Sequence, residues 1–328
     1  MPAPQELHVD RWLTDLSVAY IQEDRDFVSD KVFPVVPVKN QSDKYVIYER
    51  GSFWRNQMRP RPLGGRADIA DWAKTEGVYR VEEYALAHMV DDRQRANTDD
   101  PISLDTQAME LLSSAVAIDA DVRWANAYFQ DSTWTTDLDG NGDTDFTQIT
   151  LASGAHTGEP IELIDAQKEA VKLLTAKYPN TLTLGASAHR IIRNHSAIKE
   201  VLKYIRQAAP LNQATIADVF DVERYFVARA VYNTAAEGAA DSFSFIANAH
   251  AALLSYAPPR AGLNTPSAGY TFAWTDLEPG FTNILGGVMM RGRDDFAHSD
   301  IFEIRRANDI RLVSADLGVF FDEMTADV

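Results

Sequence analysis

The stretch TDDPISLDTQAMELLSSAVAIDADVRWANAYFQ, residues 98–130, carries the clearest secondary-structure signal in a chain of 328 residues. Asp100 can cap a helix, Pro101 suits its first position, and Asp105 places negative charge near its first turn. Apolar residues then recur at alternating steps of four and three, which predicts one helix over 100–130 with a single apolar face. That face consists of Leu104, Ala108, Leu111, Ala115, Ile118, Val122, Ala125 and Phe129. About 29 residues at about 1.5 Å each give a beam about 43 Å long, well beyond the usual helix of about 11–12 residues.

Upstream of this helix, the apolar segment DFVSDKVFPVVPVKNQSDKYVIYERG (26–51) is interrupted by Pro34 and Pro37. Proline cannot donate a ladder hydrogen bond, so the segment does not suit a central strand. The prolines instead keep the chain extended and discourage uncontrolled edge pairing. We therefore expect an N-terminal arm over 1–43, with a short helix at 13–21, that lies on the long helix or on a neighbouring chain. Its expected contact residues are Phe33, Val35 and Val36.

Between the arm and the long helix, residues 44–90 are predicted to form a two-stranded ribbon with a loose tip. The segments KYVIYER (44–50) and GVYRVEEYALAHMV (77–90) alternate as strands do, and the Gly/Pro/Arg-rich stretch between them lacks core periodicity. A two-stranded ribbon is marginal by itself in water, so we expect it to lie on another surface. Its arginines would pair with carboxylates of a neighbouring chain. The expected contact residues are Phe53, Trp54, Arg59, Arg61 and Trp72.

The second half of the chain begins with a polar insertion at 131–160 and continues as a mixed helix and strand pattern. We predict helices at 161–178, 195–207 and 215–222. We predict strands at 181–185, 223–234, 242–256, 270–274, 284–292, 301–307 and 309–321. This pattern indicates a compact α/β unit following the long helix.

Composition excludes several classes of protein. The chain contains no cysteine, which removes disulfides and thiolate metal sites. Its formal net charge of -17 argues against recognition of nucleic acid through a basic footprint. No apolar run is long enough to cross a bilayer, and the first residues lack a secretory signal, so we expect no membrane partner and a protein made in the cytoplasm.

One acidic segment, DLDGNGDTD (137–145), matches the first nine positions of a calcium loop. Its candidate ligands are Asp137, Asp139, Asn141, Asp143 and Asp145. The twelfth position holds Gln148 where such a loop needs a bidentate glutamate, and an acidic β-turn explains the pattern equally. No nucleophile elbow, phosphate loop, dinucleotide fingerprint or metal-binding histidine spacing occurs, so we expect no enzyme.

The order of these segments resembles the major capsid protein of tailed bacteriophages, which has the Hong Kong 97-type fold. AYIQEDRDFVSDKVFPVVPVKNQSDKYVIY (19–48) resembles the N-terminal arm of that family. KYPNTLTLGASAHRIIRNHSAIKEVLKYI (177–205) resembles its strand–turn–helix with the pattern N-T-L-x-L-G, and HSDIFEIRRANDIRLVSADLGVFFDEM (298–324) resembles its closing strands. The resemblance implies an α+β fold with an arm (1–43), an extended loop (44–90), a peripheral domain (91–160) containing a spine helix (100–130) and the acidic insertion (131–160), an axial domain (161–290) and returning C-terminal strands (291–328).

The resemblance also implies a function. The chain would assemble with itself into hexamers and pentamers of an icosahedral virion shell, made in the host cytoplasm, that contacts packaged double-stranded DNA non-specifically. A portal, a separate scaffolding protein and a decoration protein bound at 131–160 would be its partners. Lys44 and Lys74 lie in or near the extended loop, but no partner asparagine is identified, so we expect a non-covalent shell. An encapsulin-like compartment and a calcium-stabilised binding protein remain the alternatives.

Overall fold

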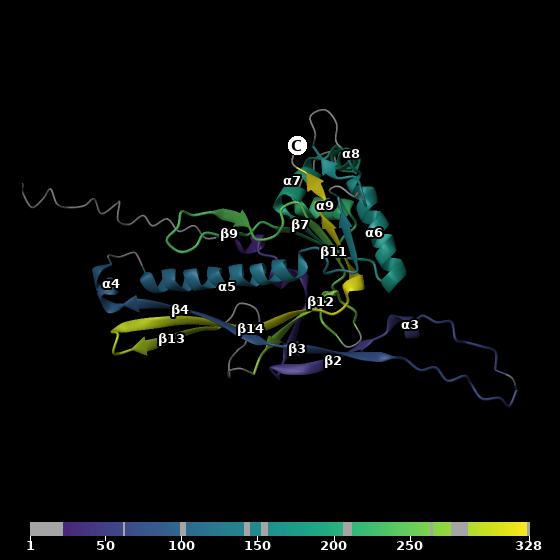
Figure 1. The fold of residues 1–328 in the computed structure, drawn as a ribbon, viewed down its shortest axis with the longest axis horizontal. Coiled ribbons are helices and arrows are strands. Elements are labelled where there is room, and N and C mark those ends of the chain that lie inside the picture. The colour runs from purple at the N-terminus through teal and green to yellow at the C-terminus, as the bar shows by residue number, and fades with distance from the viewer. Residues whose placement is uncertain are drawn as a thin grey trace, which may run out of the picture.

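The computed structural model describes residues 22–61, 63–98, 103–140, 145–151, 157–205, 212–262, 265–276 and 288–326, and the helix expected at 13–21 lies outside them. Helices and strands are mixed along this part of the chain, which confirms the α+β class. Figure 1 shows a long helix lying along one sheet, a second sheet surrounded by shorter helices, and a ribbon that extends outward. We call these the peripheral domain, the axial domain and the ribbon.

The long predicted helix is α5, Leu104–Tyr128, and its 25 residues make it the beam of the peripheral domain. It begins after Ser103, whose hydroxyl accepts a hydrogen bond from the Thr106 N–H at 3.4 Å. The expected cap at Asp100 and Pro101 lies outside the described residues. The prediction of one continuous helix is confirmed over the described length.

The prediction of which residues form the apolar face of α5 is wrong in the middle of the helix. Leu111 is 53% exposed, whereas the next residue, Leu112, is fully buried. Steps of four residues turn slightly more than one full turn of helix, so the buried stripe winds around α5. The two ends of the helix therefore face different partners. Its buried residues are Ala108, Leu112, Ala120, Asp121, Trp124 and Ala125.

The sheet beneath α5 has the order β1-β12-β14-β13, with β4 on the other edge of β14. Its strands are β1 (Val35–Val38), β4 (Glu82–Asp91), β12 (Gly269–Trp274), β13 (Val288–Asp294) and β14 (Ser299–Leu312). The apolar contact between helix and sheet joins Ala108 and Leu112 of α5 to Val90, Phe302 and Ile304. The short helix α4 (Asp92–Asn97) follows β4 at the far end of this domain (Figure 1).

The axial domain is built on a five-stranded sheet in the order β5-β15-β11-β7-β8. Its strands are β5 (Thr136–Asp139), β7 (Thr181–Gly185), β8 (Arg224–Ala228), β11 (Ala252–Ser255) and β15 (Gly318–Asp322). Its helices are α6 (Pro160–Thr175), α7 (Ala186–Asn194), α8 (Ser196–Ile205) and α9 (Gln213–Val219). Leu182 and Leu184 of the interior strand β7 are fully buried in this core. In the described ranges, no helix combines the length and hydropathy that a membrane crossing requires.

A second core joins the two domains. It unites Phe33 of the arm, Trp124 of α5 and Phe320 of β15 in one buried cluster. The two sheets are also connected covalently, because β14 of the peripheral sheet leads through the short 3-10 helix η3 (Ala315–Leu317) into β15 of the axial sheet. The described domains therefore share buried side chains as well as a covalent link.

Several expected domain boundaries differ from the structure, because local sequence patterns do not determine which strands pair with each other. β12 and β13 fall in the range expected for the axial domain, yet they pair in the peripheral sheet. The C-terminal strands do not all return to the peripheral domain, since β15 pairs with β11 of the axial sheet. Within the insertion at 131–160, β5 pairs in parallel with β15 of the axial sheet, and β6 (Ile149–Thr150) pairs in parallel with β16 (Thr325–Ala326).

The ribbon consists of β2 (Ser42–Tyr48) and β3 (Lys74–Arg80), with the one-turn helix α3 (Arg50–Phe53) near its tip. The prediction that one ribbon strand continues to residue 90 is wrong. After Val81, which is fully buried, the chain leaves the ribbon and β4 pairs with β14 instead. Burial of Val81 thus fixes the point at which the ribbon departs from the peripheral sheet.

Candidate assembly surfaces

The described part of the arm is held by a buried carboxylate of its own chain. The Val28 and Ser29 N–H groups donate to the Asp121 carboxylate of α5 at 3.1 and 2.8 Å, and the Ser29 hydroxyl adds a third donor. Burial raises the pKa of the Asp121 carboxyl, although these donors favour its charged form. Asp121 thus supplies acceptors to the first turn of α2 (Ser29–Val32), as a capping residue would.

Two further contacts fix the arm to the peripheral domain. The Arg306 guanidinium, 1% exposed, pairs with both carboxylate oxygens of Asp30, one of them at 3.1 Å. The Phe33 ring packs edge-on against Tyr128 of α5, with centroids 5.7 Å apart. Strand β1 then pairs in parallel with β12. The arm from residue 28 to 38 therefore belongs to the body of its own chain.

This placement corrects one expected assembly contact. Phe33 is 1% exposed within a single chain, so its side chain is not available to a neighbour. Val35 and Val36 are half-buried, and Val36 packs beside Val38 and Phe272. The arm was expected to lie either on its own long helix or on a neighbouring chain, and its described residues lie on their own long helix.

The base of the ribbon is anchored by aromatic stacking. The rings of Tyr79 and Phe272 stack with centroids 4.5 Å apart, and Tyr45 lies against the same Phe272 at 5.5 Å. Gly77 faces Tyr45 across the two strands, where an added Cβ would come within 2.4 Å of the tyrosine ring. The glycine thus leaves room for the ring that joins the ribbon to β12.

The tip of the ribbon is exposed and aromatic. Phe53 and Trp72 stack at 6.2 Å, and Tyr48 meets Phe53 edge-on at 5.9 Å. These side chains are nevertheless open to solvent, with Phe53 58%, Trp54 49% and Trp72 57% exposed. A preformed aromatic cluster that stays exposed is typical of a surface that binds another protein.

The same tip is positively charged on an acidic chain. Residues 50–66 contain five arginines and no acidic residue, whereas the whole chain carries -17. Arg59 and Arg61 are both exposed. The tip therefore suits an acidic partner surface, and copies of this chain supply acidic surface in excess.

A compact ionic cluster locks the far end of the peripheral domain. The Asp300 carboxylate on β14 pairs with Arg291 at 2.5 Å, Arg95 at 2.9 Å and Arg293 at 3.3 Å. Arg95 also reaches Asp105 at 2.7 Å, which adds the first turn of α5. One carboxylate thus joins α4, α5, β13 and β14.

Acid is expected to loosen this cluster. Hydrogen bonds from Arg291, and then from Arg293 and Arg95, lower the pKa of Asp300 to about 2 against the opposing effect of burial. Because the folded pKa lies below the ordinary value of 3.8, the contribution to stability is complete above about pH 4 and is lost as the pH falls towards 2. In thermal unfolding, the difference in melting temperature between the unmodified chain and Asp300→Asn should disappear as the pH falls through this window. Asp295→Asn, at an exposed neighbouring position, should show no such convergence.

The expected calcium residues are only partly described. Asp137 and Asp139 lie on the edge strand β5, and the Asp145 carboxylate accepts a hydrogen bond from the Asp139 N–H at 3.2 Å. Burial and the nearby Asp131 and Asp322 carboxylates raise the pKa of Asp137. Asn141 and Asp143 lie outside the described residues, among which no group of three metal-binding side chains occurs. Calcium binding stays a prediction.

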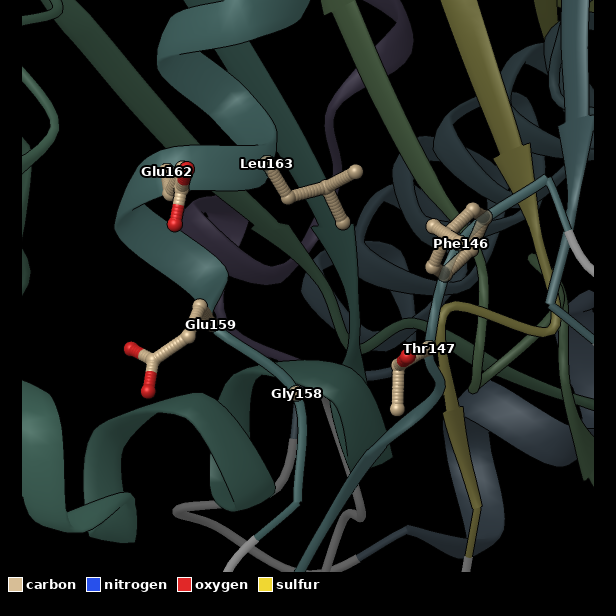
Figure 2. A pocket seen from close by; sticks show the side chains of 6 residues that line it. All are labelled: Phe146, Thr147, Gly158, Glu159, Glu162 and Leu163. Carbon is tan, nitrogen blue, oxygen red and sulfur yellow. The ribbon is translucent and has the colours of Figure 1, made fainter.

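A hollow of about 330 Å³ lies at the start of α6. Figure 2 shows Leu163 directed towards Phe146, with the Glu159 and Glu162 carboxylates on the helix side. Thr147 and Gly158 complete its lining. Among these lining residues, two carboxylates and one threonine hydroxyl stand beside apolar groups, and none of the six is basic.

No family model matches the chain. A curated relative, the major capsid protein of Burkholderia phage BcepMu, is 24% identical over 270 residues and covers 80% of this chain and 82% of its own length. A crystal structure of a phage-related protein from Bordetella bronchiseptica is 20% identical, covers 92% of this chain and 94% of its own, and has a TM-score of 0.63.

Two further structures have the same fold at low identity. The capsid of cyanophage P-SCSP1u is 10% identical, covers 99% of this chain and 94% of its own, and has a TM-score of 0.59. The SrpI encapsulin of Synechococcus elongatus is 9% identical, covers 96% of this chain and 94% of its own, and has a TM-score of 0.52. Fold, order of elements and sequence relative agree: this chain has the Hong Kong 97-type fold and is similar in sequence to a phage major capsid protein.

Proposed function

We propose that the chain assembles into hexamers and pentamers that close an icosahedral shell around phage double-stranded DNA. The observation that supports this most is the ribbon, whose tip exposes stacked aromatic rings together with Arg55, Arg59, Arg61 and Arg66. Closed symmetric assemblies repeat one interface many times, so such a tip would bury its rings on the next acidic copy. Packaged DNA would be contacted without sequence recognition, because the chain is acidic overall.

The other partners follow from the same proposal. A separate scaffolding protein would guide assembly, a portal would replace capsomer contacts at one vertex, and a decoration protein could bind near 131–160. Covalent joining is not part of the proposal. Lys44 pairs with Glu76 at 2.7 Å, so its ammonium group already has a partner within its own chain.

Electron microscopy of the purified full-length chain, produced with and without candidate scaffolding proteins, tests the proposal. We expect closed icosahedral particles that protect DNA from nuclease and give single-chain bands on denaturing gels. Particles without protected DNA would favour the encapsulin-like alternative, and a ladder of bands would contradict a non-covalent shell. A chain that stays monomeric under every condition would contradict shell formation itself.

A further inference from the structure

The hairpin of β9 (Val231–Asn233) and β10 (Phe243–Phe245) carries two exposed phenyl groups on one face. Phe243 is 70% exposed and Phe245 is 43% exposed. They are two residues apart on one strand, so both side chains point to the same side of the hairpin. Figure 1 shows the hairpin projecting from one side of the axial domain. An exposed aromatic pair of this kind suits a protein partner.

Hydrogen bonds within the hairpin hold this face in place. The Asn233 side chain donates to Asp241 at 2.8 Å and accepts from the Ser242 N–H at 3.0 Å. The Thr234 N–H also donates to the Ser242 carbonyl at 2.8 Å. The two phenylalanines therefore project from an ordered two-stranded support.

A second exposed apolar patch lies at the C-terminal end of α6. Leu173 is 85% exposed, Leu174 42% and Tyr178 54%. The backbone there is fixed, because the Ala176 N–H donates to the Lys172 carbonyl at 2.8 Å and the Lys172 ammonium group donates to the Ala176 carbonyl at 2.9 Å. Figure 1 shows α6 on the side of the axial domain opposite to the hairpin. The two patches therefore cannot cover each other within one chain.

The two patches carry opposite charge. The hairpin loop, 234–242, contains Glu237 and Asp241 and no basic residue. Lys172 and Lys177 stand beside the leucines at the end of α6, with no acidic residue between them. Glu237 and Lys177 are both exposed. Surfaces that join apolar contact to opposite charge are complementary, and the charges fix which patch meets which.

We propose that the hairpin of one copy docks on the C-terminal end of α6 of the next copy. Phe243 and Phe245 then bury their phenyl groups against Leu173 and Tyr178 of the neighbour. Contacts between two different patches run head to tail and generate closed rings of subunits, whereas a patch that binds itself gives a pair. The inference rests on the proposed assembly into hexamers and pentamers, and it names the contact between neighbours within each of them.

A charge exchange tests the docking without removing an aromatic group. Glu237→Lys places a cation opposite Lys177 of the neighbour and should raise the protein concentration required for assembly at least about 3-fold. Adding Lys177→Glu to the same chain restores opposite charges, so assembly should return to nearly the concentration that the unmodified chain requires. Both residues are exposed, and circular dichroism verifies that the variants fold. A double variant as impaired as Glu237→Lys alone would overturn the proposal.

Crosslinking of two single-cysteine variants tests the contact directly, because the chain has no cysteine of its own. Full-length Phe243→Cys and Leu173→Cys are mixed, assembled and treated with a short bismaleimide. We expect a crosslinked dimer in the mixture and none from either variant alone. The matched control mixes Leu173→Cys with Phe296→Cys, which alters a fully exposed phenylalanine between β13 and β14, and should give no dimer.

Electron microscopy of the same samples separates this inference from shell formation. Closed particles without the crosslink would overturn the hairpin contact and leave the shell standing. A crosslinked dimer in samples that never close into particles would support the contact and contradict the shell. Absence of both would contradict both. A dimer from Phe243→Cys alone would show that hairpin meets hairpin, which overturns the proposed head-to-tail contact.

Discussion

Asp121→Ala is expected to lower the free energy of unfolding by about 2–4 kcal/mol and to release the arm from the long helix. The substitution leaves the Val28 and Ser29 N–H groups without their acceptor at a site where both residues are almost fully buried. A buried donor without a partner costs about 1–3 kcal/mol, and hydrogen bonds to a charged group are stronger than average. Denaturant unfolding measures the loss, and proteolysis near residues 26–38 reports the release.

Two companion variants show whether this loss comes from the missing acceptor. Asp119→Ala removes a carboxylate from the same helix where it is 47% exposed and pairs with Arg123, so it should cost no more than about 0.5 kcal/mol. Asp121→Asn retains the volume and one acceptor oxygen, so it should fall between the two. A loss for Asp121→Ala no larger than that for Asp119→Ala would show that the arm is held by other contacts.

Removing the aromatic pair at the ribbon tip is expected to raise the concentration required for shell assembly at least about 30-fold without unfolding the chain. In Phe53→Ser with Trp72→Ser, the stacked rings are lost from a site that the single chain leaves mostly exposed. Aromatic residues at the centre of an interface contribute about 2 kcal/mol or more, and about 2 kcal/mol corresponds to roughly a 30-fold weaker contact. Because the contact repeats around a closed shell, the concentration required for assembly should rise at least that much.

Light scattering against protein concentration measures this change, and circular dichroism verifies that the subunits remain folded. The matched control is Phe53→Tyr with Trp72→Phe, which retains two aromatic rings at the same positions. The control should assemble at nearly the concentration that the unmodified chain requires. Particles formed equally well by the serine variant would place the neighbour's contact away from these rings.

The fold was predictable where a pattern is local. α5 follows from apolar spacing sustained over more than twenty residues, and β7 follows from a short buried run. Strand partners were not predictable in this way. β12 and β15 look equally strand-like in sequence, yet one pairs in the peripheral sheet and the other in the axial sheet. Pairing depends on surfaces that form only after distant segments meet.

The candidate surfaces show the same division. Exposure of Phe53, Trp54 and Trp72 was predictable because their segment lacks core periodicity. The choice between its own long helix and a neighbouring chain as the surface that buries Phe33 was not, because it depends on Tyr128. The roles of Asp121 and Arg306 were missed for a related reason. A single charged residue in a helix or strand reads as surface until its buried partner in the arm is known.

The contacts that β14 makes with the arm and the ribbon also set when, during synthesis, these two segments can become ordered. Arg306 binds Asp30 from 276 residues earlier, and the Arg80 N–H donates to Asp309 from 229 residues later. Contacts between such distant segments form late, since the intervening chain must first be present and closed into a loop. During translation, the arm and ribbon therefore emerge long before the strand that orders them. Each polypeptide can therefore complete these contacts of its arm and ribbon only after β14 has been synthesised.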